Sequence, residues 1–597
     1  MTGLRSLPLV EALSTVWRAD RRGTAGAAVL QVVGALSGLG LVLASHLALS
    51  AVVDGGSTAD LVLPLVLLAV VTAVSGSVGV LQGLQQRLLG ERVSQHVWRE
   101  LLTSCAAVDL LTYESTDFLN RLERVRGNAV SRPLSVVSAV LGLGGSLIAV
   151  LALAGSLVTI APLLVPVLLL GGIPAVLVSR RSSRAEFRFA RRATASTQRR
   201  GYLKALLSHR VTAAELRAFD AAPELLRRHA ADDAEHLRRL EVHVGARRRY
   251  ALAGLACSAV ALGCALAVIV WLASTGRISL PDAGAAAIAA RLLGGQLGTV
   301  FRSLGSLVES APFLADLSAF LREHPARTGV GTRRPLRRRV SVRGVGFSYP
   351  GQQRPALEDV SLEVPQGQVI ALVGENGSGK TTLAKVIAGL YAPDEGVVCW
   401  DGEALPMDDL RASCSVLFQD FLRYQMSVAD NVALSDSTRP VDVDRVRATV
   451  ERVGIAGAVD RLPAGLGTVL GVELEEGSDF SGGQWQRLAL ARALYRDAAL
   501  VVLDEPSAAL DPRAEHELFR DVRRVLDGRS AVLISHRYSS VRLADVVYVL
   551  HAGRVVEHGT HDELVAAGGR YAELYALQAD AYLPGERQQP APVLPAG

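Results

Sequence analysis

Six long apolar stretches in the first half of the chain constrain its fold more than any other feature. A helix needs about 20 apolar residues to cross the hydrocarbon core of a bilayer, and each stretch reaches that length. Neighbouring helices can accommodate the prolines of the fourth stretch, whereas Arg291 and Gln296 interrupt the sixth. The first half therefore predicts an all-α membrane domain of six helices. The predicted spans are 24–53, 61–82, 134–156, 158–178, 250–274 and 283–305.

The composition of the 597 residues agrees with a membrane protein. Half of the residues are hydrophobic and only 20% are charged, which is unusually apolar for a soluble protein of this length. The net charge of +5 comes mainly from arginines beside the apolar stretches, as the positive-inside rule predicts, and we expect no nucleic-acid partner. Lysine is rare and occurs only at Lys204, Lys380 and Lys385.

Two long, arginine-rich connections separate the spans, at about 83–133 and 179–249. By the positive-inside rule both connections and the N-terminus are cytoplasmic. The abundance of Ala, Gly, Leu, Val and Arg is typical of a GC-rich bacterial genome, so the membrane expected is the plasma membrane of a bacterium. Both contain apolar residues at helical intervals and little glycine or proline, so they predict helical hairpins. At a rise of about 1.5 Å per residue, the longer hairpin reaches about 50 Å into the cytosol. Its tip is expected near Val211–Phe219, and that of the other near Tyr113–Leu122.

A change of composition after Pro325 marks the end of the membrane domain, predicted as 1–325. A basic linker at 326–339 leads into β-patterned segments with glycine-rich turns. These segments predict a second domain, of α/β class, over 340–580. The last residues, 581–597, are rich in proline and glutamine and predict a disordered tail.

A phosphate-binding loop is the clearest motif in the second domain. The apolar strand Val369–Val373 is followed by a glycine-rich segment and then by the helical run Leu383–Leu390. In this order, backbone N–H groups and a helix N-terminus surround phosphate oxygens, Lys380 bridges the outer phosphates and Thr381 can hold Mg²⁺. The predicted contacts to the phosphates of ATP are Gly374, Asn376, Gly377, Ser378, Gly379, Lys380, Thr381 and Thr382.

A second apolar strand, Leu500–Leu503, ends in two acids. An aspartate at the end of a strand beside a phosphate loop can hold Mg²⁺, which is the role we expect for Asp504. The adjacent Glu505 can orient and polarise an attacking water. The sequence therefore predicts that this domain hydrolyses ATP.

Further motifs in the expected order make the segment from about 340 to 578 resemble the nucleotide-binding domain of ABC transporters. The resemblance implies that Glu505, His536 and Gln419 are catalytic, and that Gln419 joins Thr381 and Asp504 at Mg²⁺. It also implies that Tyr349 stacks on adenine. The segments that carry the resemblance are Phe347-Ser348-Tyr349-Pro350, Gln419, the signature Phe480-Ser481-Gly482-Gly483-Gln484, the D-loop Ser507–Asp511 and the switch His536.

Two positions depart from the family pattern. The signature begins with Phe480 where leucine is usual, and the preceding segment, Gly471–Gly477, lacks the acid-arginine-glycine ending of many exporters. Separately, the segment His558–Glu563 contains residue types that often bind metals. There, Thr560 and Glu563 fit a helix capping box, which we expect in place of a metal site.

The resemblance also implies a partner, because in this family ATP lies between the phosphate loop of one subunit and the signature of another. One chain carries one of each, so a homodimer is the simplest assembly, and a heterodimer with a second half-transporter remains open. The order of the domains, with the membrane domain before the nucleotide-binding domain, resembles that of exporters. The substrate expected first is a modified peptide natural product, with a lipid or amphipathic drug as the alternative. A metal-chelate importer and a regulatory protein that does not pump are the remaining readings.

Polar residues inside spans are candidates for the substrate path, because buried polar groups in membranes usually serve function. Four side chains qualify: Gln31 and His46 in the first span, and Arg291 and Gln296 in the sixth.

Overall fold

The computed structural model describes residues 8–55, 58–129, 132–325, 331–471, 478–506, 522–535 and 537–582. The chain divides into two compact units. The first contains Met1–Ala107 and Leu119–Ala326, and the second contains Val108–Phe118 and Arg327–Gly597. The short segment Val108–Phe118 therefore groups with the second unit, although the sequence assigned it to the membrane domain, because its apolar side chains pack against the core of that unit.

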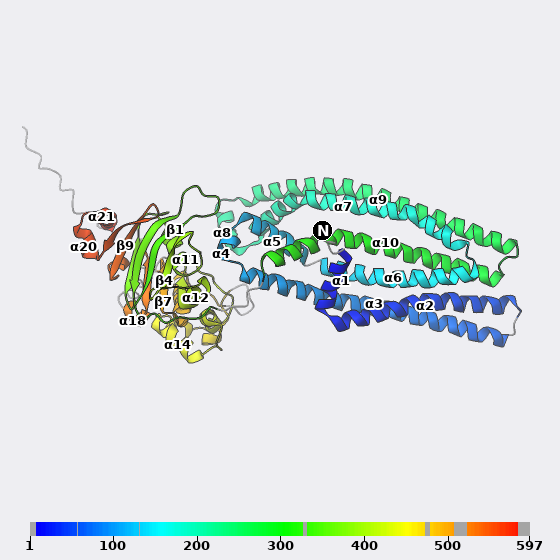
Figure 1. The fold of residues 1–597 in the computed structure, drawn as a ribbon, viewed down its shortest axis with the longest axis horizontal. Coiled ribbons are helices and arrows are strands. Elements are labelled where there is room, and N and C mark those ends of the chain that lie inside the picture. The colour runs from blue at the N-terminus through cyan, green and yellow to red at the C-terminus, as the bar shows by residue number, and fades with distance from the viewer. Residues whose placement is uncertain are drawn as a thin grey trace, which may run out of the picture. The chain divides into compact units, whose positions relative to one another are not determined.

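Helices, most of them long, make up the first unit, which we call the membrane domain. They are α1 (Pro8–Ala19), α2 (Arg21–Val53), α3 (Thr58–Ala107), α5 (Thr116–Ala129), α6 (Arg132–Ile160), α7 (Leu164–Ser208), α8 (Arg210–Ala218), α9 (Ala222–Ser274) and α10 (Leu280–Glu323). Figure 1 shows α2 beside α3, α6 beside α10 and α7 beside α9.

Among the described residues, five helices are long and apolar enough to cross a membrane. They are α2, α3, α6, α9 and α10, and they contain five of the six predicted spans. The remaining prediction, 158–178, has the wrong bounds. It crosses the boundary between α6 and α7, since Pro162 lies in the break and cannot continue the hydrogen-bond ladder of a helix. The apolar residues after that break begin α7.

Small side chains let the membrane helices approach one another. Along α10, the alanines at 285, 286, 289 and 290 are at most 1% exposed. They pack with Val42 of α2, with Leu153 and Leu157 of α6 and with Ile269 of α9 in one cluster. Because lipid is as apolar as leucine, such close van der Waals contact is what favours helix association in a bilayer.

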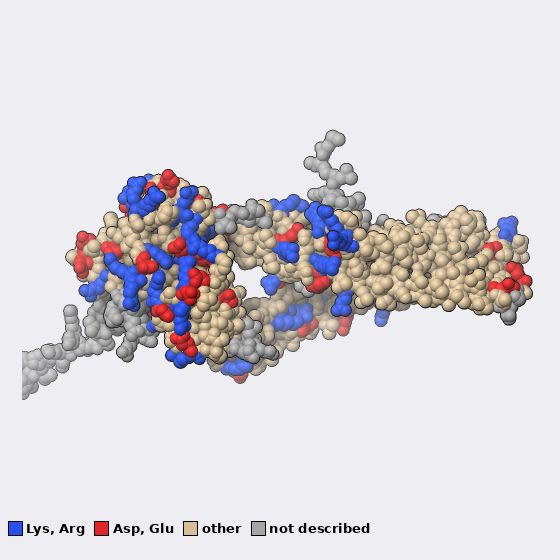
Figure 2. Space-filling view, turned by 90° about the horizontal axis from the view of Figure 1, so that it is seen from below, with Lys and Arg blue, Asp and Glu red and all other residues tan. Residues whose placement is uncertain are grey.

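The outer surface of the membrane domain is apolar. In the most apolar window of α3 only 6% of the residues are buried within the chain, and Leu63 and Val80 are 75% and 65% exposed. Figure 2 shows this surface as a tan zone over the membrane helices with charged residues at both ends. Exposure on this scale is what a lipid-facing surface requires.

Short helices occupy the connections where the hairpin tips were predicted. The first, α4 (Leu110–Tyr113), follows the end of α3, and the second, α8, separates α7 from α9. Asp109 caps α4 by accepting a hydrogen bond from the Thr112 backbone at 2.8 Å. A cap of this kind stabilises a new helix start and so favours a break from the preceding helix.

The second unit contains two sheets. An antiparallel sheet has the order β2-β1-β4-β5, and a mostly parallel sheet has the order β10-β9-β3-β8-β7-β6. The strands are β1 (Arg339–Phe347), β2 (Leu357–Pro365), β3 (Val369–Val373), β4 (Glu395–Trp400), β5 (Glu403–Ala404), β6 (Cys414–Leu417), β7 (Leu500–Asp504), β8 (Ser530–Ile534), β9 (Val546–His551) and β10 (Arg554–Gly559).

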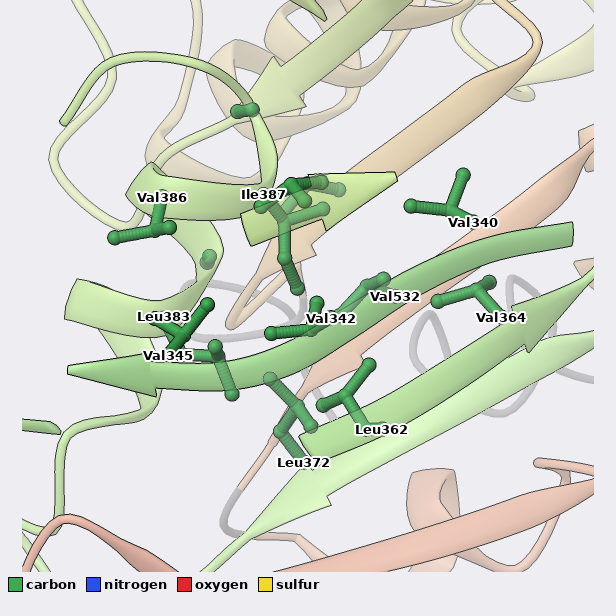
Figure 3. Close-up of a cluster of buried hydrophobic side chains, with 14 of the residues drawn as sticks. Val340, Val342, Val345, Leu362, Val364, Leu372, Leu383, Val386, Ile387 and Val532 are labelled. Carbon is green, nitrogen blue, oxygen red and sulfur yellow. The ribbon is translucent and has the colours of Figure 1, made fainter. Parts of the chain in front are cut away.

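Described helices of the second unit cover the sheets or connect their strands. They are α4, α11 (Lys380–Ile387), α12 (Met407–Ser413), α13 (Val428–Ala433), α14 (Val443–Arg452), α15 (Ala456–Val459), α16 (Gly482–Tyr495), α18 (Val522–Leu526), α19 (Tyr538–Val541), α20 (His561–Ala566) and α21 (Arg570–Tyr582). One apolar core joins both sheets to α11 (Figure 3). A second core joins the parallel sheet to α13, α14 and α16.

Leu372 belongs to the first core (Figure 3) and is fully buried. We expect Leu372→Ala to remove apolar contacts and leave a cavity, which destabilises the second unit by about 2–5 kcal/mol. The midpoint of thermal unfolding, followed by tryptophan fluorescence in detergent, should fall accordingly. The matched control is Val556→Ala on β10, where the side chain is 48% exposed; an equal loss in both variants would contradict the assignment of Leu372 to the core.

Candidate phosphate and nucleotide site

Three glycines shape the loop between β3 and α11. Gly374, Gly377 and Gly379 have φ values of +148°, +79° and +103°, a region that favours glycine. A Cβ atom on Gly374 would lie 2.2 Å from the Leu550 carbonyl oxygen, and one on Gly379 would lie 2.7 Å from that of Ala356. The backbone can therefore curl tightly only because these positions lack side chains.

Lys380 begins α11 and its side chain folds back over this loop. Its Nζ donates hydrogen bonds to the backbone oxygens of Gly374 and Glu375, both at 2.9 Å. Burial lowers the pKa of the Lys380 ammonium, and the charges of Glu505 and Asp504 oppose that shift. The loop therefore holds a cation where a phosphate could replace carbonyl oxygens as its partner.

Asp504 ends β7 and is 4% exposed. Burial raises the pKa of its carboxyl group, and a hydrogen bond with Thr381 opposes the shift. β8 lies between β3 and β7, so the strand of Asp504 is separated from the phosphate-loop strand by one strand. Even so, Asp504 and Thr381 meet, and together with Gln419 they offer the oxygen ligands that suit Mg²⁺.

Gln419 and Glu505 are also brought together. β6 and β7 are parallel neighbours, so the residues that follow them emerge at the same edge of the sheet. The Gln419 Nε2 donates a hydrogen bond to Glu505 Oε2 at 2.8 Å. Since the charge of Glu505 acts on Lys380, this contact joins the Gln419 amide to a carboxylate of the same site.

Tyr349 follows β1 and packs edge-on against two aromatic rings. Its ring centre lies 5.1 Å from Phe347 and 5.8 Å from Tyr391. Its hydroxyl is hydrogen-bonded to the Thr382 hydroxyl at 3.0 Å. An aromatic ring is therefore held directly beside the phosphate loop, where it can stack on a base.

Ser481 is the N-cap of α16, with Gly482 and Gly483 in the first turn. The Ser481 hydroxyl accepts from the Gln484 N–H at 3.4 Å, and the Gln484 Oε1 accepts from the Ser481 N–H at 2.9 Å. This capping box was not anticipated from the sequence, although the spacing of serine and glutamine fits one. The predicted capping box of Thr560 and Glu563 is present at α20.

Some predicted residues fall outside the described part of the chain. They are the D-loop with Asp511, the switch residue His536, residues 472–477 before the signature and the tail from residue 583. The nucleotide roles of Asp511 and His536 therefore stay predictions.

One network at the site was missed from the sequence. The Tyr391 hydroxyl donates to the carboxylate of Glu114, with oxygens at 2.7 and 2.8 Å, and accepts from Lys385 Nζ at 2.9 Å. The Tyr391 ring stacks on Phe347 at 5.0 Å. Because Glu114 and Tyr391 are 277 positions apart, no local pattern could have joined them.

The four candidates in the membrane domain have different surroundings. Arg291 lines a cavity of about 390 Å³ with Gly294, Gly295 and Gly298 of its own helix. It forms no hydrogen bond or ion pair with any residue that the structure describes. His46 is hydrogen-bonded to Asp282 at 3.0 Å.

The two glutamines do not line that cavity. Gln31 packs against α6, where its Oε1 lies 2.1 Å from the position a Cβ on Gly145 would take. Gln31 is therefore a helix-packing residue, and Gln296 lies outside the lining of the cavity. Of the four candidates, the geometry favours Arg291.

The phosphate loop gives a graded test of the glycine requirement. We expect Gly379→Ala to abolish ATP binding, because it adds a backbone clash to an unfavourable φ. Gly377→Ala should weaken binding less, since the position has the same backbone strain and open space around it. Binding of a fluorescent ATP analogue to the purified chain measures both. Equal affinities in the two variants would contradict the role of the clash.

Comparisons with known proteins agree with this geometry. The family model described as "ABC transporter" matches residues 357–508. Proteins named ATP-dependent lipid A-core flippase are similar to the chain. The one from Aromatoleum aromaticum is 42% identical over 247 residues, 40% of each protein. The one from Bordetella avium is 36% identical over 332 residues, 54% of this chain and 55% of the relative. The chain thus spans about two fifths to half of the length of these relatives.

A solved structure of a bacterial Atm1-family ABC exporter with ATP bound covers nearly the whole chain. It matches 95% of this chain and 99% of its own, with a TM-score of 0.80 and 22% sequence identity. At that identity the match establishes a shared fold. Residues 357–508 therefore match the ABC transporter family, and the chain as a whole shares the fold of that solved exporter chain.

Proposed function

We propose that two copies of this chain form an exporter that hydrolyses ATP to move an amphipathic, lipid-like molecule out of a bacterial cytosol or inner leaflet. One observation carries the proposal. The phosphate loop, Asp504 and Glu505 meet at one site, in a chain whose other half consists of membrane-length helices. A protein that only binds ATP would need the phosphate loop alone, whereas a carboxylate beside that loop can activate a water for hydrolysis.

Each residue at the site has a role in the proposed reaction. Lys380 exchanges its carbonyl partners for the outer phosphates and neutralises their charge. Glu505 accepts a hydrogen bond from the attacking water, and Gln419 holds the Glu505 carboxylate in place through the 2.8 Å contact. Tyr349 orients the base. Mg²⁺, held by Thr381, Asp504 and Gln419, would stabilise charge on the phosphates.

Assembly of two copies follows from the family arrangement, in which the signature serves the ATP of the other subunit. The exposed tip α8 supports a partner. Val211 and Phe219 are 89% and 75% exposed, and α8 contains no buried residue. Large apolar side chains at a helix tip are typical of a surface that another chain covers. The membrane segments and arginine-rich hairpins favour a cytoplasmic ATP-binding domain.

The tip of the first hairpin can pass motion to the nucleotide site. Glu114 contacts Tyr391, which packs against Tyr349 and accepts a hydrogen bond from Lys385 of α11. The carboxylate is therefore tied to the helix that begins with Lys380. Closure around ATP would move this tip and with it the membrane helices.

An amphipathic substrate suits the cavity beside Arg291. Its lining is apolar except for the arginine and Ser258, so it can accept an apolar body and one anionic or polar group. The names of the relatives favour a lipid over the peptide natural product expected first. A drug, a metal chelate or a regulatory role without pumping has no comparable support.

The decisive experiment measures ATP-dependent uptake of a fluorescent lipid into inside-out vesicles that contain only this chain. We expect uptake by the wild type and loss of it in Glu505→Gln, together with a fall in hydrolysis of about 100-fold or more. The control is Glu451→Gln on α14, an exposed acid paired with Arg447. Uptake of a cyclic peptide but not of lipid would restore the peptide reading, and full hydrolysis by Glu505→Gln would refute the catalytic role.

Arg291→Gln tests the cavity separately. Removing the cation should reduce lipid uptake several-fold while basal ATP hydrolysis stays unchanged, because the cavity lies in the membrane domain. Arg277→Gln is the matched control, since Arg277 lies over Trp271 outside the cavity. Unchanged uptake in Arg291→Gln would remove Arg291 from the substrate path.

A further inference from the structure

Glu505 has an unusual backbone conformation. Its φ is +50°, in the left-handed region that costs a residue with a side chain on the order of 1–3 kcal/mol. Pro506 follows it, and a residue before proline normally prefers an extended backbone. An unconstrained Glu505 would therefore relax to another conformation and turn its carboxylate elsewhere.

Within the described part of the chain, hydrogen bonds from two elements hold this backbone. The Glu505 N–H donates to the Ile534 carbonyl of β8 at 2.9 Å. The Glu505 carbonyl accepts from the side-chain amide of Gln486 at 3.1 Å. The first bond belongs to the end of the sheet, whereas the second comes from a different element, α16.

Gln486 is well placed to act as a fixed support. It is 3% exposed, and an amide buried to this degree requires hydrogen-bond partners. Its helix is anchored on both sides of it. Trp485 Nε1 donates to Asp479 Oδ1 at 2.7 Å, and Arg492 Nε donates to the Asn431 carbonyl at 2.9 Å. The amide therefore cannot follow Glu505 if its backbone tries to relax.

We propose that Gln486 is a positioning residue for ATP hydrolysis. It holds the strained backbone of Glu505, so that the carboxylate stays within reach of Gln419 and of the attacking water. The inference rests on the proposed function, in which Glu505 acts on that water. In this proposal Gln486 acts through the Glu505 backbone and not directly on the nucleotide or the water.

The helix that carries Gln486, α16, also connects it to the signature. Ser481 of the signature caps α16, and Gln486 lies within the first two turns of that helix. In the proposed dimer, Ser481 meets the ATP of one site and Glu505 serves the other. A displacement of α16 when the signature engages ATP is therefore transmitted to the Glu505 backbone.

The test compares ATP hydrolysis by the full chain in nanodiscs. Gln486→Met keeps the length of the side chain and removes the donor. We expect the kcat to fall by about 10- to 100-fold, with the KM and the affinity for a fluorescent ATP analogue within twofold of wild type. Gln486→Asn keeps the amide but shortens its reach. It should reproduce the loss of kcat, and it serves as the second variant if Gln486→Met packs poorly.

The matched control is the next residue of the helix. Arg487 also donates to a backbone carbonyl, that of Gly454 at 2.9 Å, so Arg487→Met removes a similar bond away from the site. We expect a normal kcat. Thermal unfolding midpoints of all variants separate a loss of stability from a loss of positioning.

A double substitution distinguishes positioning from a general structural role. In the Glu505→Gln background, adding Gln486→Met should change the residual rate less than twofold. Gln486 is proposed to act only through the Glu505 carboxylate, which that background lacks. A wild-type kcat in both Gln486 variants, or an equal fold loss in the two backgrounds, would overturn the inference. If the wild type does not hydrolyse ATP, or Glu505→Gln retains full activity, the proposed function fails instead.

Discussion

The packing of α11 between the two sheets is the constraint on which the nucleotide site depends. Leu383, Val386 and Ile387 of this helix are fully buried and contact both sheets in one core. The helix is only eight residues long and would not form alone. The burial of this helix therefore fixes the positions of Lys380 and Thr381 at its start, and of the glycine loop that precedes them. The carboxylates of Asp504 and Glu505 reach this point because their strand belongs to the same core.

Much of the site was predictable because its signals are local. The buried strand, the glycine loop and the helix that follows occupy adjacent positions, and β7 ends directly in Asp504. What the sequence could not supply was pairing across distance. It did not indicate that β8 separates β3 from β7, nor that Glu114 meets Tyr391. The roles of Asp511 and His536 stay predictions.

The membrane domain shows the same division between local and distant signals. Five apolar stretches lie within helices, since length and composition decide whether a segment spans. The fourth was misplaced because hydropathy continues through Pro162 while the helix does not. Polar residues were harder to interpret. Gln31 and His46 have neighbours in adjacent helices, and Arg291 alone faces the cavity, a difference that depends on helix packing rather than on residue type.

The scarcity of lysine has a practical consequence. Of the three lysines, Lys380 is 9% exposed and lies in the phosphate loop, and Lys385 is held by Tyr391 and Glu114. Lys204 is exposed on α7, six positions before α8 begins. Lys204 is therefore the most exposed of the three lysine side chains, and it lies next to a hairpin tip. In the proposed dimer, energy transfer between dyes attached at Lys204 of the two copies would report the separation of the tips through the proposed ATP cycle, without any engineered cysteine.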